Sequence, residues 1–320
     1  MKLNRRWTLG AIAALALVQT VAAQKAPPLT IVVGATPGGS TDTLARVIAQ
    51  SMGTTLNRTV IVENKPGAGG NIAAQHVAKS EPNGNTLLMS FTSHTINATL
   101  FKKLPFDPVA DFTPITMVAQ VPSVLVARKN APFDDVKGLI DYAKKNPGKL
   151  TFALGGQGSS LHLAGEQFKL ATGTDIVNIP YKGTGPALND LLSASTVDLM
   201  FASTINVLPH YKSGSMKFLG VSSPKPLAQF EGLPTIAQTV PGYHSQAWFG
   251  LFGPAKMPKA VVDTLYGAIK KAIDSPEYRK RMESEAATVP NMTPAQFADF
   301  IRKDVDLWGD IVKKSGATVE

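Results

Sequence analysis

Residues 34–42, with the sequence GATPGGSTD, combine the residue types that bind small anions through the backbone. The segment follows an apolar run and precedes a helical pattern, so it is expected to join a strand to a helix N-terminus. Gly38 and Gly39 allow the backbone to turn its N–H groups inward. Ser40 or Thr41 is expected to cap the helix, whose first turn adds partial positive charge. The segment therefore predicts an anion cradle.

A second segment of the same construction occurs at residues 155–160, with the sequence GGQGSS. It too lies between an apolar run and a helical pattern. A single glycine-rich loop is most often only a tight turn, but two such loops at equivalent places favour a binding role. We therefore expect two cradles that serve one ligand site.

Other chemistry is not indicated by the sequence. A nucleotide-binding P-loop would need a lysine where Ser40 stands, and the second loop lacks the third glycine and the acidic residue of a dinucleotide fingerprint. No nucleophile elbow or marked pair of carboxylates is present. The histidines show no metal-ligand spacing; they are His76, His94, His162, His210 and His244. The sequence predicts no catalytic residue, no metal site and no cofactor.

The elements that position the loops follow a strand–helix–strand order that predicts parallel βαβ units. Strands are expected at residues 29–33, 59–64 and 86–91, with a first helix at about residues 42–53. The pattern is repeated in the second half, where residues 150–152, 176–183 and 199–206 correspond to the three strands. The predicted fold is α/β, with two lobes that each hold a small, mostly parallel sheet flanked by helices.

Two apolar runs outside the repeats, residues 121–126 and 247–252, are expected to cross between the lobes as a two-strand hinge. Two periodic helices at residues 258–273 and 294–314 should return to pack on the first lobe. A capping box of Thr293 and Gln296 begins the second of them. The predicted organisation is residues 1–23 as a signal peptide, 24–122 plus 250–320 as lobe 1, and 123–249 as lobe 2.

The first 23 residues have the features of a cleavable export signal, with Lys2, Arg5 and Arg6 ahead of a short apolar run. General secretion and twin-arginine export both stay open. Removal of this segment loses no acidic residue and lowers the net charge from +9 to +6. The remaining basic residues are scattered and form no stripe with interleaved aromatics, which argues against nucleic acid as a partner. The absence of cysteine excludes disulfides and suits an exported protein that is stabilised by its core.

Four motifs in order resemble the Bug-type solute receptors of tripartite tricarboxylate transporters. They are VGATPGGSTD at 33–42, VENKPGAGGN at 62–71, PYKG at 180–183 and WFG at 248–250. The resemblance covers the whole chain after the signal. It implies a two-lobed periplasmic binding protein of type II-like fold that closes on a small di- or tricarboxylate. It also implies delivery of that ligand to a two-component membrane permease, by a monomer that is not an enzyme.

The resemblance also implies ligand contacts, made mainly by backbone N–H groups and hydroxyls. One carboxylate clamp would be Pro37, Gly38, Gly39, Ser40, Thr41 and Asp42, and the facing clamp would be Gly155, Gly156, Gln157, Gly158, Ser159 and Ser160. Thr92, Ser93, His94, Tyr181, Lys182, Gly183, Thr184, Ala202, Ser203 and Thr204 would frame the space between.

Three of these residues carry more specific expectations. Asp42 is expected to brace its loop by accepting loop N–H groups, and His94 is either a cleft residue or a hydrogen-bonded structural histidine. A side chain at Gly39 is expected to obstruct the anion and to disfavour the backbone angles of the loop. The small pair Ala35 and Thr36 departs from the bulkier residues of many family members and leaves room for an aromatic dicarboxylate such as terephthalate.

Two other functions stay open at this point. An extracytoplasmic sensor for a membrane histidine kinase would have the same fold and the same kind of ligand. An enzyme of carboxylate metabolism would need a catalytic group that the sequence does not reveal.

Overall fold

The computed structural model describes residues 27–181, 184–194 and 196–319. The predicted signal peptide, together with Lys182 and Gly183, lies outside the described residues. Within them, no helix has both the length and the apolar character needed to cross a membrane.

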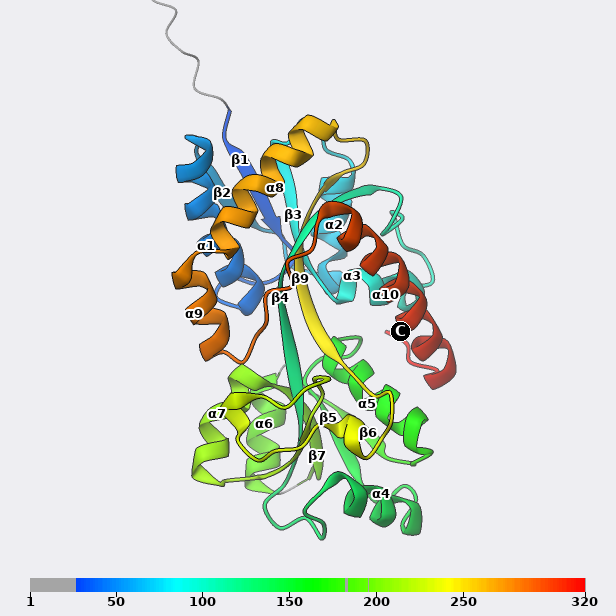
Figure 1. Ribbon diagram of the computed structural model, residues 1–320. Coiled ribbons are helices and arrows are strands. Elements are labelled where there is room, and N and C mark those ends of the chain that lie inside the picture. The colour runs from blue at the N-terminus through cyan, green and yellow to red at the C-terminus, as the bar shows by residue number, and fades with distance from the viewer. Residues whose placement is uncertain (1–26, 182–183, 195, 320) are drawn as a thin grey trace, which may run out of the picture.

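Strands and helices alternate through most of the described chain (Figure 1). The strands are β1 (Leu29–Val33), β2 (Val60–Asn64), β3 (Thr86–Phe91), β4 (Phe112–Ala127), β5 (Thr151–Leu154), β6 (Val177–Pro180), β7 (Leu199–Ser203), β8 (Lys217–Val221) and β9 (Gln246–Pro254). The α-helices are α1 (Ser40–Leu56), α2 (Asn71–Ala78), α3 (Ser93–Leu100), α4 (Val136–Lys145), α5 (Ser160–Thr172), α6 (Thr184–Ser193), α7 (Thr204–Ser213), α8 (Lys259–Ile273), α9 (Pro276–Ser284) and α10 (Pro294–Ser315). Short 3₁₀ turns lie at Ala68–Gly70, Ala228–Phe230 and Ile236–Gln238.

The strand order repeats the plan that the sequence predicts for each half. Along the sheet the order is β2-β1-β3-β9-β4-β7-β5-β6, with β8 also paired to β4. Each half therefore has three parallel strands in the order 2-1-3 and one antiparallel neighbour, β9 in one half and β4 in the other. The two sheets are not separate, however, because β4 and β9 pair with each other and connect them.

β4 makes this connection because it is far longer than the apolar run that predicted it. Its residues Phe112 to Pro122 pair with β9, and Ser123 to Ala127 pair with β7. In Figure 1, β4 and β9 run side by side through the waist of the molecule, with the β1–β3 lobe above and the β5–β7 lobe below. Thirteen of the sixteen residues of β4 are buried, which the flanking helices on both sides require.

Apolar residues on both faces of the sheet form the core of each lobe. In the β1–β3 lobe, α1 and α8 cover one face with Ile48, Met52 and Ile269 fully buried. The other face packs against α2 and α10, where Phe297 lies beside Trp248 and Phe252. The two C-terminal periodic helices thus pack on opposite faces of this sheet.

α10 also contacts the other lobe. Its Trp308 and Ile311 form a small apolar cluster with Leu100 of α3 and Leu163 of α5. Beyond the end of α10, the carbonyl of Thr318 accepts a hydrogen bond of 2.5 Å from the Gln157 side chain. We call residues 316–319 the tail; it extends the contact between α10 and the loop that precedes α5.

A second contact between the lobes follows α9, a helix that the sequence analysis did not predict. There the Glu285 carbonyl accepts a hydrogen bond of 2.9 Å from the Thr204 hydroxyl at the start of α7. Ala286 packs into an apolar cluster of the β5–β7 lobe. The lobes are thus connected by two strands and also touch through α10, the tail and the segment after α9.

Candidate functional site

The first glycine loop, residues 34–39, joins β1 to α1. Gly38 has a φ of +84°, which favours glycine, whereas Gly39 has φ −75° and ψ 170°, which any residue can adopt. Gly39 itself is the N-cap of α1 and supplies no side-chain cap, so the expectation that Ser40 or Thr41 caps this helix is wrong. The expected strain from a side chain at Gly39 is also wrong, because the strained position is Gly38.

Asp42 braces this loop, as the sequence analysis expected. Its carboxylate accepts hydrogen bonds of 2.9 Å from the Gly38 N–H and 2.9 Å from the Asn64 side chain on β2. Arg46, one turn along α1, pairs with both carboxylate oxygens. The hydrogen bond from Arg46 is the largest cause that holds the pKa of Asp42 at about 2, against the effect of its burial. These bonds occupy the Asp42 carboxylate within the protein, so Asp42 acts on the loop from behind.

The second glycine loop, residues 155–159, joins β5 to α5 in the same way. Gly158 has a φ of +74°, and Ser159 caps α5 by accepting a hydrogen bond from the His162 N–H. Gly155 lies so close to Thr184 that a Cβ at Gly155 would come within 2.9 Å of the Thr184 Cα, which explains the glycine there. The loop therefore packs directly on the start of α6.

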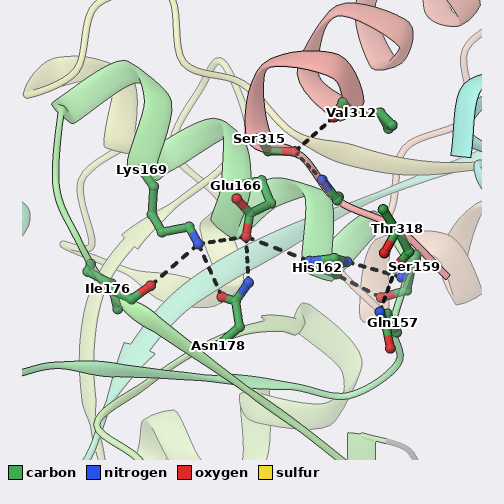
Figure 2. A network of polar contacts seen from close by, with 12 residues as sticks. Gln157, Ser159, His162, Glu166, Lys169, Ile176, Asn178, Val312, Ser315 and Thr318 are labelled. Atoms are coloured by element: carbon green, nitrogen blue, oxygen red, sulfur yellow. Dashed lines mark hydrogen bonds and ion pairs between the residues drawn. The ribbon is translucent and has the colours of Figure 1, made fainter. Parts of the chain in front are cut away.

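His162 takes the place in this lobe that Asp42 takes in the other, and Figure 2 shows its polar contacts. Its Nδ1 accepts a buried hydrogen bond of 3.0 Å from the Gly158 N–H. Its Nε2 lies 3.6 Å from the carboxylate of Glu166, one turn along α5. Glu166 also accepts from Asn178 on β6 at 2.6 Å and pairs with Lys169 at 2.7 Å. Burial opposes ionisation of Glu166, but these contacts hold its pKa at about 2.

The two loops lie on the facing edges of the lobes. β1 runs from the far end of its lobe toward the waist, and β5 runs toward the waist from the other side (Figure 1). In the described part of the chain, the N–H groups of Ser40 and Thr41 have no acceptor, and the same holds for Ser160 and Leu161. Both helix N-termini can therefore donate to an anion.

Residues after β3 contribute less to this edge than the sequence analysis expected. The Thr92 hydroxyl accepts a hydrogen bond of 2.9 Å from the Trp248 N–H, and Ser93 is buried at the start of α3. The side chain of His94 is directed into an aromatic cluster, which includes Phe112 and Phe252, and not into a cleft. Its Nε2 is 2.9 Å from the Pro108 carbonyl, and burial lowers its pKa to about 4. His94 is therefore a structural histidine, and the expectation that it frames the ligand space is wrong.

The residues of the β5–β7 lobe that were expected to frame the ligand space differ in how far they are exposed. The Tyr181 hydroxyl donates to Asp190, and Thr184 lies against Gly155. Ser203 is half-buried at the N-terminus of α7 and has no side-chain capping bond. Ala202 and Thr204 have no exposed surface, and the Thr204 hydroxyl is bonded to the Glu285 carbonyl, so neither side chain is free to meet a ligand.

A buried carboxylate lies near the waist, where α3, α10 and β9 meet. Asp304 accepts hydrogen bonds of 2.6 Å from the Thr95 hydroxyl and 2.7 Å from the Trp248 indole. Burial raises its pKa to about 6. A cavity of about 180 Å³ adjoins it and is also lined by His244 and Lys303. The sequence analysis missed Asp304 because its partners come from distant segments.

Sequence reasoning also missed the residues that hold the loops from behind. Arg46 and Glu166 lie four residues after Asp42 and His162, and Asn64 and Asn178 lie on the neighbouring strands. The signal that could have found them is their equal spacing from the two glycine loops. In the described ranges, no three or more His, Cys, Asp or Glu side chains gather in an arrangement that could hold a metal ion.

Comparison with known proteins extends over nearly the whole chain. The family model described as tripartite tricarboxylate transporter family receptor matches residues 44–317. BugT of Bordetella pertussis strain Tohama I is 34% identical over 317 residues, which cover 97% of this chain and 96% of BugT.

Two similar solved structures contain carboxylates. Rpa4515 of R. palustris, solved with adipate, is 31% identical and has a TM-score of 0.79, over 91% of this chain and 98% of that one. MatC (Rpa3494) from Rhodopseudomonas palustris, with bound malate, is 32% identical and has a TM-score of 0.76, over 89% of this chain and 98% of that one.

Proposed function

The chain belongs to the tripartite tricarboxylate transporter receptor family, and we propose that it is a periplasmic solute-binding protein that captures a small carboxylate between its two lobes. It then delivers the ligand, as a monomer, to a two-component membrane permease. The N-terminal export signal is cleaved before Gln24. Adipate and malate in the two related structures support a dicarboxylate as ligand.

One observation carries this proposal: each lobe presents to the other a glycine loop and a helix N-terminus whose first N–H groups have no acceptor among the described residues. Ser40 and Thr41 donate from α1, and Ser160 and Leu161 donate from α5. Two anion cradles that face each other match a molecule with two carboxylates. Pro37 and Gln157 are exposed in these loops, and Gly156 and Ser203 are half-buried, so we assign all four to the surroundings of the ligand.

Capture requires the lobes to move, and β4 and β9 are the hinge of that motion. The pairing of β4 changes from β9 to β7 between Pro122 and Ser123, and we place the lobe boundary there and near Phe249. Ligand bridges the two loops and favours the closed arrangement. The contacts through Thr204 and Thr318 limit how far the lobes separate.

A thermal-shift screen tests the ligand class with malate, adipate, citrate and terephthalate. At one hundred times the dissociation constant, binding stabilises the native state by about 2.7 kcal/mol, which raises the melting temperature by about 5 °C. The small residues Ala35 and Thr36 in the first loop favour a response to terephthalate as well as to the aliphatic acids. Solution scattering with the best ligand should show a smaller radius of gyration.

Gly39→Val tests whether the first cradle is the site. The backbone at Gly39 accepts a side chain, and a Cβ there would meet only the Thr36 carbonyl at an ordinary 3.6 Å. The variant should therefore fold but lose at least tenfold in affinity, because the side chain blocks the approach of the anion. Gly267→Val, at an open position on α8, is the matched control and should bind normally. Full affinity in Gly39→Val, or no response to any carboxylate in the wild type, would contradict the proposal.

A further inference from the structure

The two glycine loops are held from behind by equivalent sets of residues. In each loop a glycine with positive φ donates its N–H to the side chain four residues later: Gly38 to Asp42, and Gly158 to His162. In each case that side chain meets a charged residue one turn further along the helix, and an asparagine of the neighbouring strand donates to the carboxylate of the pair, Asp42 in the first loop and Glu166 in the second. These second partners are Arg46 and Asn64 for the first loop, and Glu166 and Asn178 for the second.

Asp42 and His162, the side chains that hold the two loops, differ in their protonation chemistry. A carboxylate such as Asp42 accepts hydrogen bonds whenever it is ionised. An imidazole accepts at Nδ1 only when that nitrogen carries no proton. Because the Gly158 N–H points at Nδ1 from 3.0 Å, the ring of His162 is neutral and carries its proton on Nε2. Nε2 faces the Glu166 carboxylate at 3.6 Å, which favours the proton at that atom.

We propose that His162 is a positioning residue for ligand binding: as the neutral Nε2–H tautomer it fixes the second glycine loop in the conformation that presents the α5 N-terminus to the ligand. This inference rests on the proposed function. A second proton on the ring would place an N–H at Nδ1 opposite the Gly158 N–H, and the loop would have to move away.

His162 borders a cavity of about 340 Å³, whose lining shows which groups surround it. Its charged lining residues are Glu166 and Lys169, both on α5. Asn178 and Pro180 line it from β6, and Gln157 and the tail line it from the other side (Figure 2). Glu166 and Lys169 are paired with each other, which leaves Nδ1 of His162 as the acceptor for the Gly158 N–H.

Isosteric variants of His162 test the roles of its two ring nitrogens separately. The amide oxygen of asparagine reaches the position of Nδ1, so His162→Asn keeps the acceptor for Gly158. Glutamine reaches the position of Nε2, so His162→Gln loses it. By NMR, the Gly158 amide should exchange slowly in the wild type and in His162→Asn, and at least tenfold faster in His162→Gln. The imidazole ¹⁵N shifts of wild-type His162 should show Nδ1 without a proton. His210→Gln, a change of a half-buried histidine in the same lobe, should leave Gly158 unchanged.

Calorimetry with malate and adipate gives the second readout. His162→Gln should bind the better of the two probes roughly three- to tenfold more weakly, the worth of one hydrogen bond. If neither probe binds the wild type but Gly158 exchange changes as described, the brace stands and the proposed function fails. If Gly158 exchange is equal in all variants, or if His162→Gln loosens Gly158 but keeps full affinity, the inference is wrong.

Discussion

Replacement of Asp304 by asparagine should change how the stability of the protein depends on pH. The carboxylate is 8% exposed and joins α10 to α3 and β9 through Thr95 and Trp248. Asparagine keeps an oxygen that can accept both hydrogen bonds, but it carries no charge at any pH. The variant therefore isolates the cost of an ionised carboxylate in this place.

The magnitude follows from the pKa of Asp304, which burial raises from 3.8 to about 6. The folded state holds this proton more tightly than the unfolded state, so stability falls as pH rises through the interval between the two values and is constant above it. A difference of two pKa units corresponds to about 3 kcal/mol, of which 2 to 3 kcal/mol should be visible between pH 4 and pH 8. As pH rises from 4 to 8, the stability of Asp304→Asn relative to the wild type should therefore increase by that amount.

Urea denaturation followed by tryptophan fluorescence at pH 4 and pH 8 measures this difference, provided the m-values of the two proteins agree. Asp310→Asn is the matched control on the same helix, since the Asp310 side chain is 69% exposed and is solvated in both states. If the difference in free energy of unfolding between the wild type and Asp304→Asn is the same at both pH values, the reasoning is refuted, because ionisation of the buried carboxylate would then not destabilise the protein.

Two predictions concern the first glycine loop. Asp42→Asn should lower the free energy of unfolding by about 1 to 2 kcal/mol at pH 7, and this loss should shrink between about pH 4 and pH 2, because the pKa of Asp42 is lowered to about 2 and its stabilisation is lost as it protonates. Denaturant titrations at pH 7 and pH 3 measure the loss, and a loss that is equal at both pH values would contradict this prediction. Gly38→Ala should lower stability by about 1 kcal/mol more than Gly39→Ala, because only Gly38 has positive φ; equal melting temperatures for the two variants would show that the loop does not impose that angle.

The sequence predicted those parts of the fold whose signals are local. The bounds of β1 and β3 and the capping box of Thr293 and Gln296 came out as predicted, since apolar runs between turn residues and cap spacing are short-range patterns. The length of β4 was not predictable in the same way. Its first half includes Thr113, Pro114 and Thr116, which are strand residues here because β9 pairs with them.

The candidate site shows the same division. The positions of both glycine loops could be predicted from glycine spacing, but the partners of their N–H groups depend on side chains one turn later and on a neighbouring strand. His94 follows a strand end, which is a typical place for a ligand residue. It is nevertheless buried, because α3 begins at once and turns it toward Phe112 and Phe252, residues that no local pattern connects to it.

The tail has a practical consequence for anyone who builds a biosensor from this protein. Thr318 is bonded to Gln157 in the second glycine loop near the waist, whereas β1 begins at the far end of its lobe (Figure 1). A purification tag fused behind the tail would start beside the second glycine loop and compete with it for space, while one placed ahead of Leu29 would not. The same location makes the tail a useful attachment point for a dye. A fluorophore on Ala317 would sit where α10 of one lobe meets α5 of the other, and its emission would report their separation directly.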